Sequence, residues 1–403
     1  MDLKSGYPFW AVRNGLMQAF PRLERDLQCD VLVIGGGITG ALIADHLGQH
    51  GHDVAVVEQR DIGWGSTAAS TALLQYEIDT PMQALARRYG LDQALLAYRA
   101  CAEAIGQLRQ LARQVGKVDF QPADSLYYAS RTRDLSVLID EYELRRKHGF
   151  AVHWLDAAGV RADYGFNAPG AILSDLAARM DPYRMTYRLL ARLQRRGSQV
   201  FDRTHITALE ATTRQVHARS SDGLRIRCKH VVMAAGYASQ HWLDPRVARN
   251  RSSYAFVTDP LPEAALGPLR TTMLWETAHP YLYLRSTADN RLLVGGEDDA
   301  LDVPARRDAR VDAKARTLVD KVGRLFPQLR LTPAFAWAGT FAETRDGLPF
   351  FGPHPQWGPR VHFAMAYGGN GITYSMTGAG IVRATIEKRP HPLKALFSFD
   401  RLG

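Results

Sequence analysis

The chain has few cysteines and no long apolar run. Its 403 residues include 3 cysteines, widely separated at Cys29, Cys101 and Cys228, which argues against a disulfide framework or a metal-binding cysteine cluster. No run of about 18 apolar residues is present, so no membrane span is expected. The N-terminal segment also lacks the apolar core of a signal peptide. We therefore expect a cytoplasmic protein without a metal site.

Lysine is scarce as well. The net charge is +9, yet only 8 of the 50 basic residues are lysine, and the remaining 42 are arginine. The arginines are scattered in pairs such as Arg87–Arg88 and Arg145–Arg146 rather than gathered in a block. Scattered charge is typical of a solvated surface, so we expect no DNA partner.

The segment 30–58 is rich in the residues that a dinucleotide-binding unit needs. Apolar runs at 31–34 and 54–57 predict two buried strands, with a glycine-rich turn and a helix between them. An acid, Glu58, closes the second strand. An isolated glycine-rich turn occurs in many α/β proteins, but this complete order favours a dinucleotide site.

The three glycines of this unit, Gly35, Gly37 and Gly40, have the spacing G-x-G-x-x-G. Gly35 permits the tight turn, Gly37 lets the backbone approach a pyrophosphate, and Gly40 lets the helix pack closely on the strand. The helix then begins near Ile38 and Thr39 and presents N–H groups to the phosphates. Its positive dipole end adds to this attraction.

Glu58, followed by Gln59, is placed to accept hydrogen bonds from a ribose 2′-OH. Its charge would repel a 2′-phosphate, so FAD or NAD is favoured over NADP. The loop after it contains the small residues Gly65, Ser66 and Thr67, and taken alone such a run indicates only a flexible turn.

The pattern ExxxxxxGSTxxS, from Glu58 to Ser70, resembles the D-amino-acid oxidase superfamily of FAD-dependent amine oxidoreductases. That group includes sarcosine oxidases, glycine oxidases, γ-glutamylputrescine oxidoreductase-like enzymes and glycerol-3-phosphate dehydrogenases. Further similar segments follow in chain order at Val231–Gly236, Thr344–Pro353 and Ala366–Val382, and an expected strand, Gln199–Ile206, precedes the first of them. The resemblance spans essentially the whole chain.

This resemblance implies an α/β protein with a Rossmann-like FAD-binding domain and a second, α+β substrate domain built on an antiparallel sheet. Both domains are expected to be discontinuous. We expect the FAD-binding domain from residues 22–80, 180–243 and 334–403, the substrate domain from 81–179 and 244–333, and an N-terminal lead-in at 1–21. Periodicity also predicts helices over 82–115 with a break at Gly90, 134–147, 182–197 and 308–326, and a hairpin of 281–285 with 291–295.

The resemblance also implies which residues bind FAD, and it implies a non-covalent cofactor. The family's cysteine attachment position falls in 278–281, which holds no cysteine, and its histidine position is occupied by alanines. In the segment 368–373 we expect backbone N–H groups, and the Thr373 hydroxyl, near the flavin pyrimidine oxygen; a plain glycine-rich turn is the alternative. The expected cofactor-binding residues are Gly35, Gly37, Ile38, Thr39, Gly40, Glu58, Gln59, Gly65, Ser66, Thr67, Ile206, Ala235, Gly236, Gly369, Asn370, Gly371, Ile372 and Thr373.

Two departures from the family pattern concern the substrate. Phe341 and Gln75 stand where members that oxidise amino acids carry the arginines that grip the substrate carboxylate. We therefore expect a small-molecule amine without an adjacent α-carboxylate, oxidised by hydride transfer to the flavin. Arg285 is a candidate anchor for an acid, with a surface arginine as the alternative.

Other candidate pocket residues are Tyr281, Tyr283 and Asn370; the two tyrosines share one face of a strand that is either pocket wall or core. The electron acceptor is oxygen or another compound. The lysine that activates oxygen in sarcosine oxidases would fall near Leu293, and its absence favours a dehydrogenase slightly.

Two alternatives remain open at this point. The segment ST-x-L-L-x-x-E echoes the loop of glycerol-3-phosphate-type dehydrogenases. The positive charge also leaves a flavin module of a tRNA-modifying enzyme open, although no basic and aromatic cluster supports RNA binding.

Overall fold

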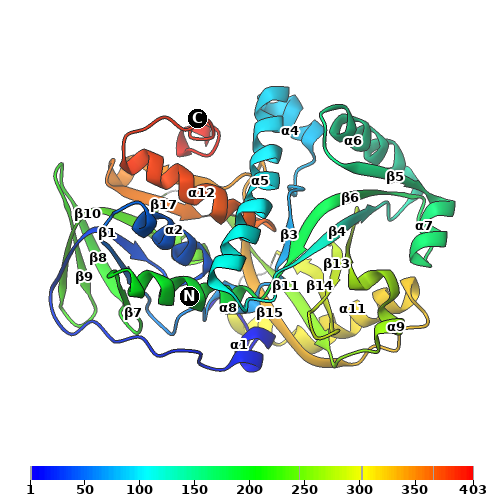
Figure 1. Ribbon diagram of the computed structural model, residues 1–403, viewed down its shortest axis with the longest axis horizontal. Coiled ribbons are helices and arrows are strands. Elements are labelled where there is room, and N and C mark those ends of the chain that lie inside the picture. The colour runs from blue at the N-terminus through cyan, green and yellow to red at the C-terminus, as the bar shows by residue number, and fades with distance from the viewer. Residues whose placement is uncertain (1, 245, 301–302, 366, 403) are drawn as a thin grey trace.

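The computed structural model describes residues 2–244, 246–300, 303–365 and 367–402 (Figure 1). The residues outside these ranges are Met1, Pro245, Leu301, Asp302, Ala366 and Gly403. The expected domain segments include all six of them, and the motif Ala366–Val382 begins with one. Two sheets organise the described part of the chain.

The first sheet contains the glycine-rich turn. Its central strand, β1 (Leu27–Ile34), pairs in parallel with β2 (Val54–Val57) on one side and with β10 (Arg225–Met233) on the other. Because helices cover both faces, these strands are buried and consist largely of apolar residues. The strand order is β16-β17-β10-β1-β2-β7, with β9 also paired to β10 and β8 to β9. The remaining bounds are β7 Gln199–Phe201, β8 Ile206–Ala211, β9 Val216–Ser220, β16 Phe350–Pro353 and β17 Val361–Met365.

Three helices flank this sheet: α2 (Ile38–Gln49), α8 (Pro182–Arg195) and α12 (Gly371–Ile386). Helix α2 packs against both α12 and α8, and Figure 1 shows α2 and α12 side by side. Helix α8 begins where the sequence predicts, because the Asp181 carboxylate accepts a hydrogen bond from the N–H of Arg184 at 2.9 Å. The long helix α5 (Leu91–Val115) packs against α12 and lies between the two halves of the molecule in Figure 1.

The second sheet has nine strands, in the order β15-β11-β14-β13-β12-β4-β6-β3, with β5 also paired to β6. Its pairs are antiparallel except for β12 with β4. The bounds are β3 Leu73–Gln75, β4 Gln121–Tyr128, β5 Val152–Asp156, β6 Gly170–Arg179, β11 Arg249–Thr258, β12 Thr272–Glu276, β13 Leu282–Ser286, β14 Leu292–Asp299 and β15 Pro333–Glu343. A Rossmann-like unit beside an antiparallel sheet is the fold class that the sequence predicts, and the prediction is confirmed.

Shorter elements complete the fold. Helix α11 packs against β11, β14 and β15, and α6 and α7 pack against β5 and β6. The remaining helices are α1 Phe9–Asn14, α3 Ser66–Ala69, α4 Met82–Tyr89, α6 Leu135–Lys147, α7 Ala157–Tyr164, α9 Glu263–Leu266, α10 Pro304–Asp308 and α11 Val311–Leu325. The 3-10 turns are η1 Thr132–Asp134, η2 Gly236–Trp242, η3 Gly267–Arg270, η4 Pro355–Trp357 and η5 Phe399–Leu402.

Two sequence-based expectations are wrong in detail. The expected strand Gln199–Ile206 is not continuous, because the chain turns after β7 and Arg203 adopts a positive φ of 45°. Ile206 therefore begins a separate strand, β8. The expected helix 308–326 is also divided, since α10 ends at Asp308 and α11 begins at Val311.

The N-terminal lead-in is part of the body of the protein. The N–H of Ser5 donates to the carbonyl of Ala338 at 3.0 Å, and the N–H of Thr340 donates to the carbonyl of Leu3 at 2.8 Å. Residues 3–5 thus lie along β15, the outermost strand of the second sheet. Phe9 and Trp10 are 2% and 1% exposed, so this segment is anchored by packing as well.

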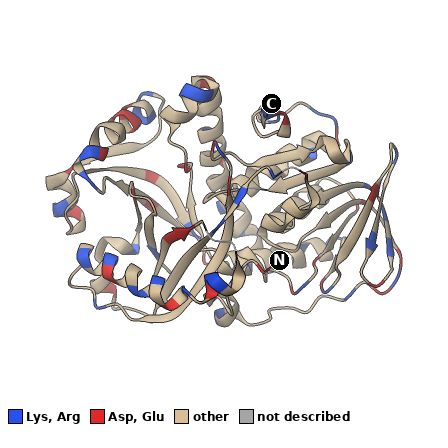
Figure 2. Ribbon diagram, turned by 180° about the vertical axis from the view of Figure 1, so that it is seen from behind, with Lys and Arg blue, Asp and Glu red and all other residues tan. Residues whose placement is uncertain are grey.

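The expected domain boundaries stay a prediction. Strands β3 and β15 fall inside segments assigned to the FAD-binding domain, yet both hydrogen-bond into the nine-stranded sheet. Figure 2 shows Lys and Arg distributed over both halves of the molecule, interspersed with Asp and Glu. Among the helices that the structure describes, none is long and apolar enough to cross a membrane.

Candidate functional site

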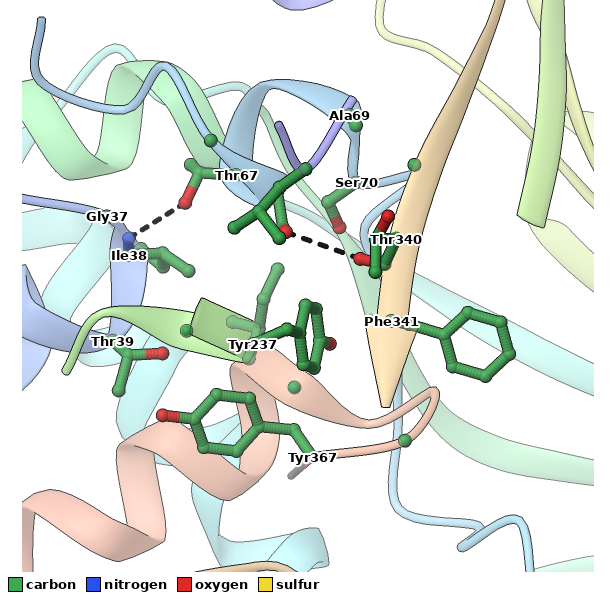
Figure 3. A pocket seen from close by; sticks show the side chains of 18 of the residues that line it. Gly37, Ile38, Thr39, Thr67, Ala69, Ser70, Tyr237, Thr340, Phe341 and Tyr367 are labelled. Atoms are coloured by element: carbon green, nitrogen blue, oxygen red, sulfur yellow. Dashed lines mark hydrogen bonds between the residues drawn. The ribbon is translucent and has the colours of Figure 1, made fainter. Parts of the chain in front are cut away.

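A cavity of about 610 Å³ is lined by residues from both sheets. One group of lining residues comes from the turn after β1, the start of α2 and the end of β2; the other comes from β12 to β15 and the segment after β3. In the view of Figure 3, Gly37 and Thr67 lie on one side of the cavity and Phe341 on the other. Cavities of this size are typical of small-molecule and cofactor sites.

The glycine-rich turn leaves no room for side chains. Gly35 has a φ of +120°, and a Cβ there would lie 2.3 Å from the carbonyl oxygen of Ala234. A Cβ on Gly40 would lie 1.9 Å from the carbonyl oxygen of Gly35. Gly40 does not line the cavity. The close approach of α2 to the loop, which is the role that the sequence predicts for Gly40, agrees with this contact.

The start of α2 faces the cavity. Gly37 is the N-cap, and the N–H of Ile38 donates to the Thr67 hydroxyl at 2.9 Å, as Figure 3 shows. The Thr39 hydroxyl lies 2.7 Å from that of Ser375 on α12. The loop after β2 is thereby tied to the helix that carries the positive dipole end, and this arrangement suits an anionic group.

Glu58 lines the cavity at the end of β2. Its Oε2 accepts the N–H of Gly36 at 2.8 Å, and its Oε1 accepts the N–H of Arg60 at 2.9 Å. Burial raises the pKa of Glu58, although these N–H donors act in the opposite direction. A carboxylate has about four acceptor positions, so the Glu58 carboxylate can still accept ligand hydroxyls.

The segment before α12 forms another wall. The N–H of Gly369 donates to Oδ2 of Asp79 at 2.8 Å, and the Asn370 side chain donates to the carbonyl oxygens of Glu77 and Gln75 at 2.7 and 3.3 Å. Thr373 is 2% exposed and does not line the cavity, because its hydroxyl donates to the carbonyl of Asn370 at 3.0 Å. The expected role of the Thr373 hydroxyl is therefore corrected.

Four of the expected pocket residues from the second sheet and its neighbouring loops line the cavity: Gln75, Tyr281, Tyr283 and Phe341. The Gln75 amide donates to the Ser125 hydroxyl at 2.9 Å. The Tyr283 hydroxyl lies 3.1 Å from the Ser253 hydroxyl. The two tyrosines, whose strand face the sequence left open between pocket wall and core, thus form part of the wall.

Arg285 lies away from the cavity. It is 1% exposed, and its guanidinium donates to the carbonyl oxygens of Thr71, Met180 and Ser286 at 2.6, 3.1 and 3.1 Å. Its charge is also 5.4 Å from the centre of the Trp10 ring. The guanidinium donates its hydrogen bonds to backbone carbonyls of three separate segments and is buried among them. The expectation that Arg285 anchors a substrate acid is therefore corrected.

The structure brings most of the expected cofactor residues to one cavity. Gly40 and Thr373 are the expected cofactor residues that do not line it. Those that do are Gly35, Gly37, Ile38, Thr39, Glu58, Gln59, Gly65, Ser66, Thr67, Ile206, Ala235, Gly236, Gly369, Asn370, Gly371 and Ile372. Their roles as contacts stay a prediction.

Several lining residues were missed by sequence reasoning. They include the carboxylates Asp79, Asp298 and Glu343 and the aromatic residues Trp275, Tyr237 and Tyr367. A sequence signal exists for some of them, because Asp298 follows the apolar run of β14 and Glu343 ends β15. Acids at the ends of buried strands are candidates for a site at the sheet edge.

Comparisons with known proteins agree with this arrangement. The profile of the family described as "FAD dependent oxidoreductase" (DAO) matches residues 30–384. The chain is 26% identical over 374 residues to gamma-glutamylputrescine oxidoreductase of Escherichia coli (strain K12), covering 91% of this chain and 85% of that protein. It is 24% identical over 371 residues to glycine oxidase of Geobacillus kaustophilus (strain HTA426), covering 89% and 93%. A crystal structure of glycine oxidase from Geobacillus kaustophilus matches with a TM-score of 0.76 at 19% identity, covering 92% of this chain and 98% of that one.

Proposed function

Because the chain belongs to the FAD-dependent oxidoreductase (DAO) family, we propose that it oxidises the C–N bond of a small amine that lacks an adjacent α-carboxylate. FAD is the cofactor of this family. The proposal concerns the substrate, the residues that hold both molecules, and the electron acceptor.

The residues of the cavity fit FAD. A cradle of glycines stands at the start of α2, where a Cβ on Gly35 or Gly40 would collide with backbone. Gly37 and Ile38 would face the pyrophosphate, and Glu58 would accept hydrogen bonds from the adenosine ribose. On the other side, Gly369 and its neighbours would lie along the flavin, with the N-terminus of α12 directed at it.

When bound, FAD accepts two electrons and a proton as a hydride from the carbon that carries the amine. In balance, the C–H bond next to nitrogen breaks, a proton leaves the nitrogen, and a C=N bond remains that water hydrolyses to a carbonyl compound and an amine or ammonia. The chain's own contribution is to bind the amine beside the flavin and to orient its C–H bond. Tyr281, Tyr283 and Phe341 would exclude water from one side of it.

The observation that carries the substrate proposal is the absence of a carboxylate clamp. Phe341 and Gln75 replace the arginines that grip an α-carboxylate in amino-acid-oxidising members, and both line the cavity. Among the lining residues that the structure describes, Arg60 is the one arginine, and it lies two residues after Glu58 in the chain. Without a bidentate guanidinium beside Phe341 and Gln75, the carboxylate of an α-amino acid has no strong binding partner there.

One relative supports this substrate class, whereas the glycine oxidases among the relatives are named for an amino acid. The supporting relative is named for γ-glutamylputrescine, a compound with an amine remote from its carboxylate. A glycerol-3-phosphate-type activity is less well supported, because the phosphate would meet the carboxylates Asp79, Asp298 and Glu343.

The test is anaerobic reduction of the flavin. Alkylamines and diamines should bleach the flavin of the purified protein faster than glycine, sarcosine or simple D-amino acids. Efficient reduction by sarcosine or a D-amino acid would overturn the substrate assignment. Reoxidation of the reduced protein by oxygen, compared with an artificial acceptor such as a quinone, separates an oxidase from a dehydrogenase.

A second experiment addresses the form of the cofactor. Acid or heat should release all of the flavin as free FAD, because 278–281 holds no cysteine and alanines occupy the histidine position. Flavin that precipitates with the protein would contradict non-covalent binding.

A further inference from the structure

Three carboxylates from the strands and loops of the second sheet line the same cavity. Asp79 follows β3, Asp298 lies in β14, and Glu343 ends β15, and all three line the cavity. Burial is the main reason that the pKa of Asp298 is raised to about 6, and burial also raises the pKa of Asp79. The negative charge of Glu343 adds to both increases, and that of Asp79 adds to the increase at Asp298.

Part of this negative charge has no partner. Glu343 is paired with Arg251, and Asp79 accepts the N–H of Gly369. The Asp298 side chain has the Ser253 hydroxyl as a hydrogen-bond partner, but its Oδ1 is buried and has none among the residues that the structure describes. A buried acceptor that lacks a donor is costly for the protein, and a ligand that supplies the donor removes this cost.

A second buried carboxylate of the same wall is also incompletely paired. Glu77 lines the cavity and is 3% exposed. Its Oε1 accepts the Ser174 hydroxyl at 2.7 Å and lies 3.7 Å from Arg145, whereas its Oε2 has no hydrogen-bond partner within the described part of the chain. Two separate carboxylates of this wall thus have free acceptor capacity.

Aromatic faces accompany these acids. Trp275, Tyr281 and Tyr283 line the cavity, and Trp275 is held in place by stacking on Tyr127, with ring centres 3.7 Å apart and planes 10° apart. Aromatic faces together with carboxylates are the surroundings that alkylammonium groups prefer. A metal ion is a poorer occupant, because no group of three His, Cys, Asp or Glu side chains in the described chain could hold one.

We propose that this end of the cavity binds a second, remote ammonium group of the substrate, with Asp298 as its main partner, so that the enzyme prefers diamines and polyamines over monoamines. The inference rests on the proposed function and specifies its substrate class. Asp298, Asp79 and Glu343 form the remote-ammonium site.

The chemistry of amine oxidation supports this assignment. The reacting nitrogen must be neutral to release a hydride from the neighbouring carbon, and a nearby carboxylate favours the charged form of an amine. Carboxylates close to the reacting nitrogen would therefore slow the reaction. A second nitrogen that stays charged gains from the same carboxylates, and the remote-ammonium site thus acts on binding rather than on the chemical step.

The experiment compares 1,4-diaminobutane with butylamine and N-acetyl-1,4-diaminobutane, which lack the second charge. Stopped-flow flavin reduction gives a Kd and a limiting rate for each. The unchanged protein should bind the diamine at least about tenfold more tightly. Asp298→Asn should raise the Kd of the diamine about tenfold and change that of butylamine less than about threefold.

The matched control is Asp299→Asn, the next residue of β14. Asp299 does not line the cavity, and its Oδ2 accepts hydrogen bonds from Arg310 at 2.8 Å and Tyr254 at 3.0 Å. This variant loses the same charge but should bind the diamine as the unchanged protein does. Folding is checked by FAD content and Tm, and Asp298→Asn should melt at the same temperature or higher, because it removes a carboxylate that is buried among like charges.

The outcomes separate the two proposals. Equal Kd values for diamine and monoamine, or an equal loss of both in Asp298→Asn, would overturn the remote-ammonium site while amine oxidation stands. If no amine reduces the flavin, the proposed function fails. The same compounds are then inert ligands whose Kd values follow from changes in the flavin absorption spectrum, and a preference for the diamine that Asp298→Asn abolishes would still support the site.

Discussion

The two ends of the cavity are built in different ways. The end around Gly35, Gly37 and Glu58 comes from one continuous stretch of chain, 30–58, and much of what it presents is backbone. The end around Asp298 and Phe341 is assembled from strand ends and loops far apart in the sequence, and what it presents is side chains. The proposed function therefore assigns the cofactor to main-chain geometry at one end of the cavity and the substrate to side chains at the other.

This difference explains why relatives of one fold act on different compounds. Replacing a side chain at the substrate end leaves the backbone around the cofactor unchanged, so the flavin chemistry survives a change of substrate. Substitutions at the two ends should therefore have separable effects, and four experiments test this separation.

The largest effect is expected at the cofactor end, from Gly40→Ala. The alanine Cβ would lie 1.9 Å from the carbonyl oxygen of Gly35, so the backbone of the glycine-rich turn or of α2 must move. We expect a protein without bound FAD, or one that fails to accumulate, measured as the ratio of flavin to protein absorbance. Gly106→Ala is the control, because its Cβ meets nothing within 4 Å in α5 and alanine favours a helix. Full flavin content in Gly40→Ala would show that this turn tolerates a shift.

Glu58→Ala should weaken the cofactor end without destroying it. The variant loses the charged acceptor for the ribose and for the N–H groups of Gly36 and Arg60. A hydrogen bond to a charged group contributes about 1.5–3 kcal/mol, so the Kd of FAD should rise roughly 10- to 150-fold. Equilibrium titration of the apoprotein with FAD measures this, with the exposed Glu24→Ala as control. An unchanged Kd would place the ribose elsewhere.

Phe341→Arg should change the substrate end alone. The new guanidinium would enter the cavity and bind small carboxylates such as benzoate about tenfold more tightly, while FAD content stays the same. Perturbation of the flavin spectrum reports the binding. Phe335→Arg is the matched control, because Phe335 lies on the same strand, does not line the cavity and is 37% exposed. No gain in carboxylate binding would mean that Phe341 does not contact the substrate.

The smallest effect concerns pH. Because the pKa of Asp298 is raised to about 6, its carboxylate is charged above that pH and becomes neutral as the pH falls through it. Burial raises this pKa most, and a hydrogen bond from the Ser253 hydroxyl lowers it. The charges of Glu343 and Asp79 raise it further, Arg251 lowers it, and Tyr283 faces Asp298 from β13. The ratio of the Kd of 1,4-diaminobutane to that of butylamine should rise about threefold between pH 7.5 and pH 5.5. The ratio is the quantity to measure, because protonation of the reacting amine at low pH affects both compounds alike. Asp298→Asn should remove this dependence, and the same dependence in that variant would assign it to another group.

The two ends of the cavity also differ in how far the sequence predicts them. The unit at 30–58 was predicted because glycine spacing, helix and strand are local, and each depends on neighbours within a few residues. The break at Gly90 between α4 and α5 and the start of α8 at Asp181 were predicted for the same reason, since a glycine and a capping side chain act locally.

The substrate end could be predicted only in part. Tyr281, Tyr283 and Arg285 alternate along one strand, so period-2 reasoning puts all three on one face. The two tyrosines line the cavity, whereas Arg285 lies farther along the chain and donates to the carbonyls of Thr71 and Met180. Which residues of a strand face a cavity depends on how distant segments pair with that strand, and a local sequence pattern does not show this. Asp298, Asp79 and Glu343 also come from distant segments, and the sequence does not predict that they line one cavity.

The contacts of the N-terminal segment determine when during synthesis the cavity wall can be completed. Leu3 lines the cavity, and residues 3–5 are held by β15, with Ser5 and Ala338 being 333 residues apart. Ribosomes add roughly 5–20 residues per second, so tens of seconds separate the synthesis of these two partners. Until β15 emerges, the segment has no strand to pair with and the wall that it completes is missing. The nascent chain thus cannot complete this wall of the cavity before β15 has been synthesised.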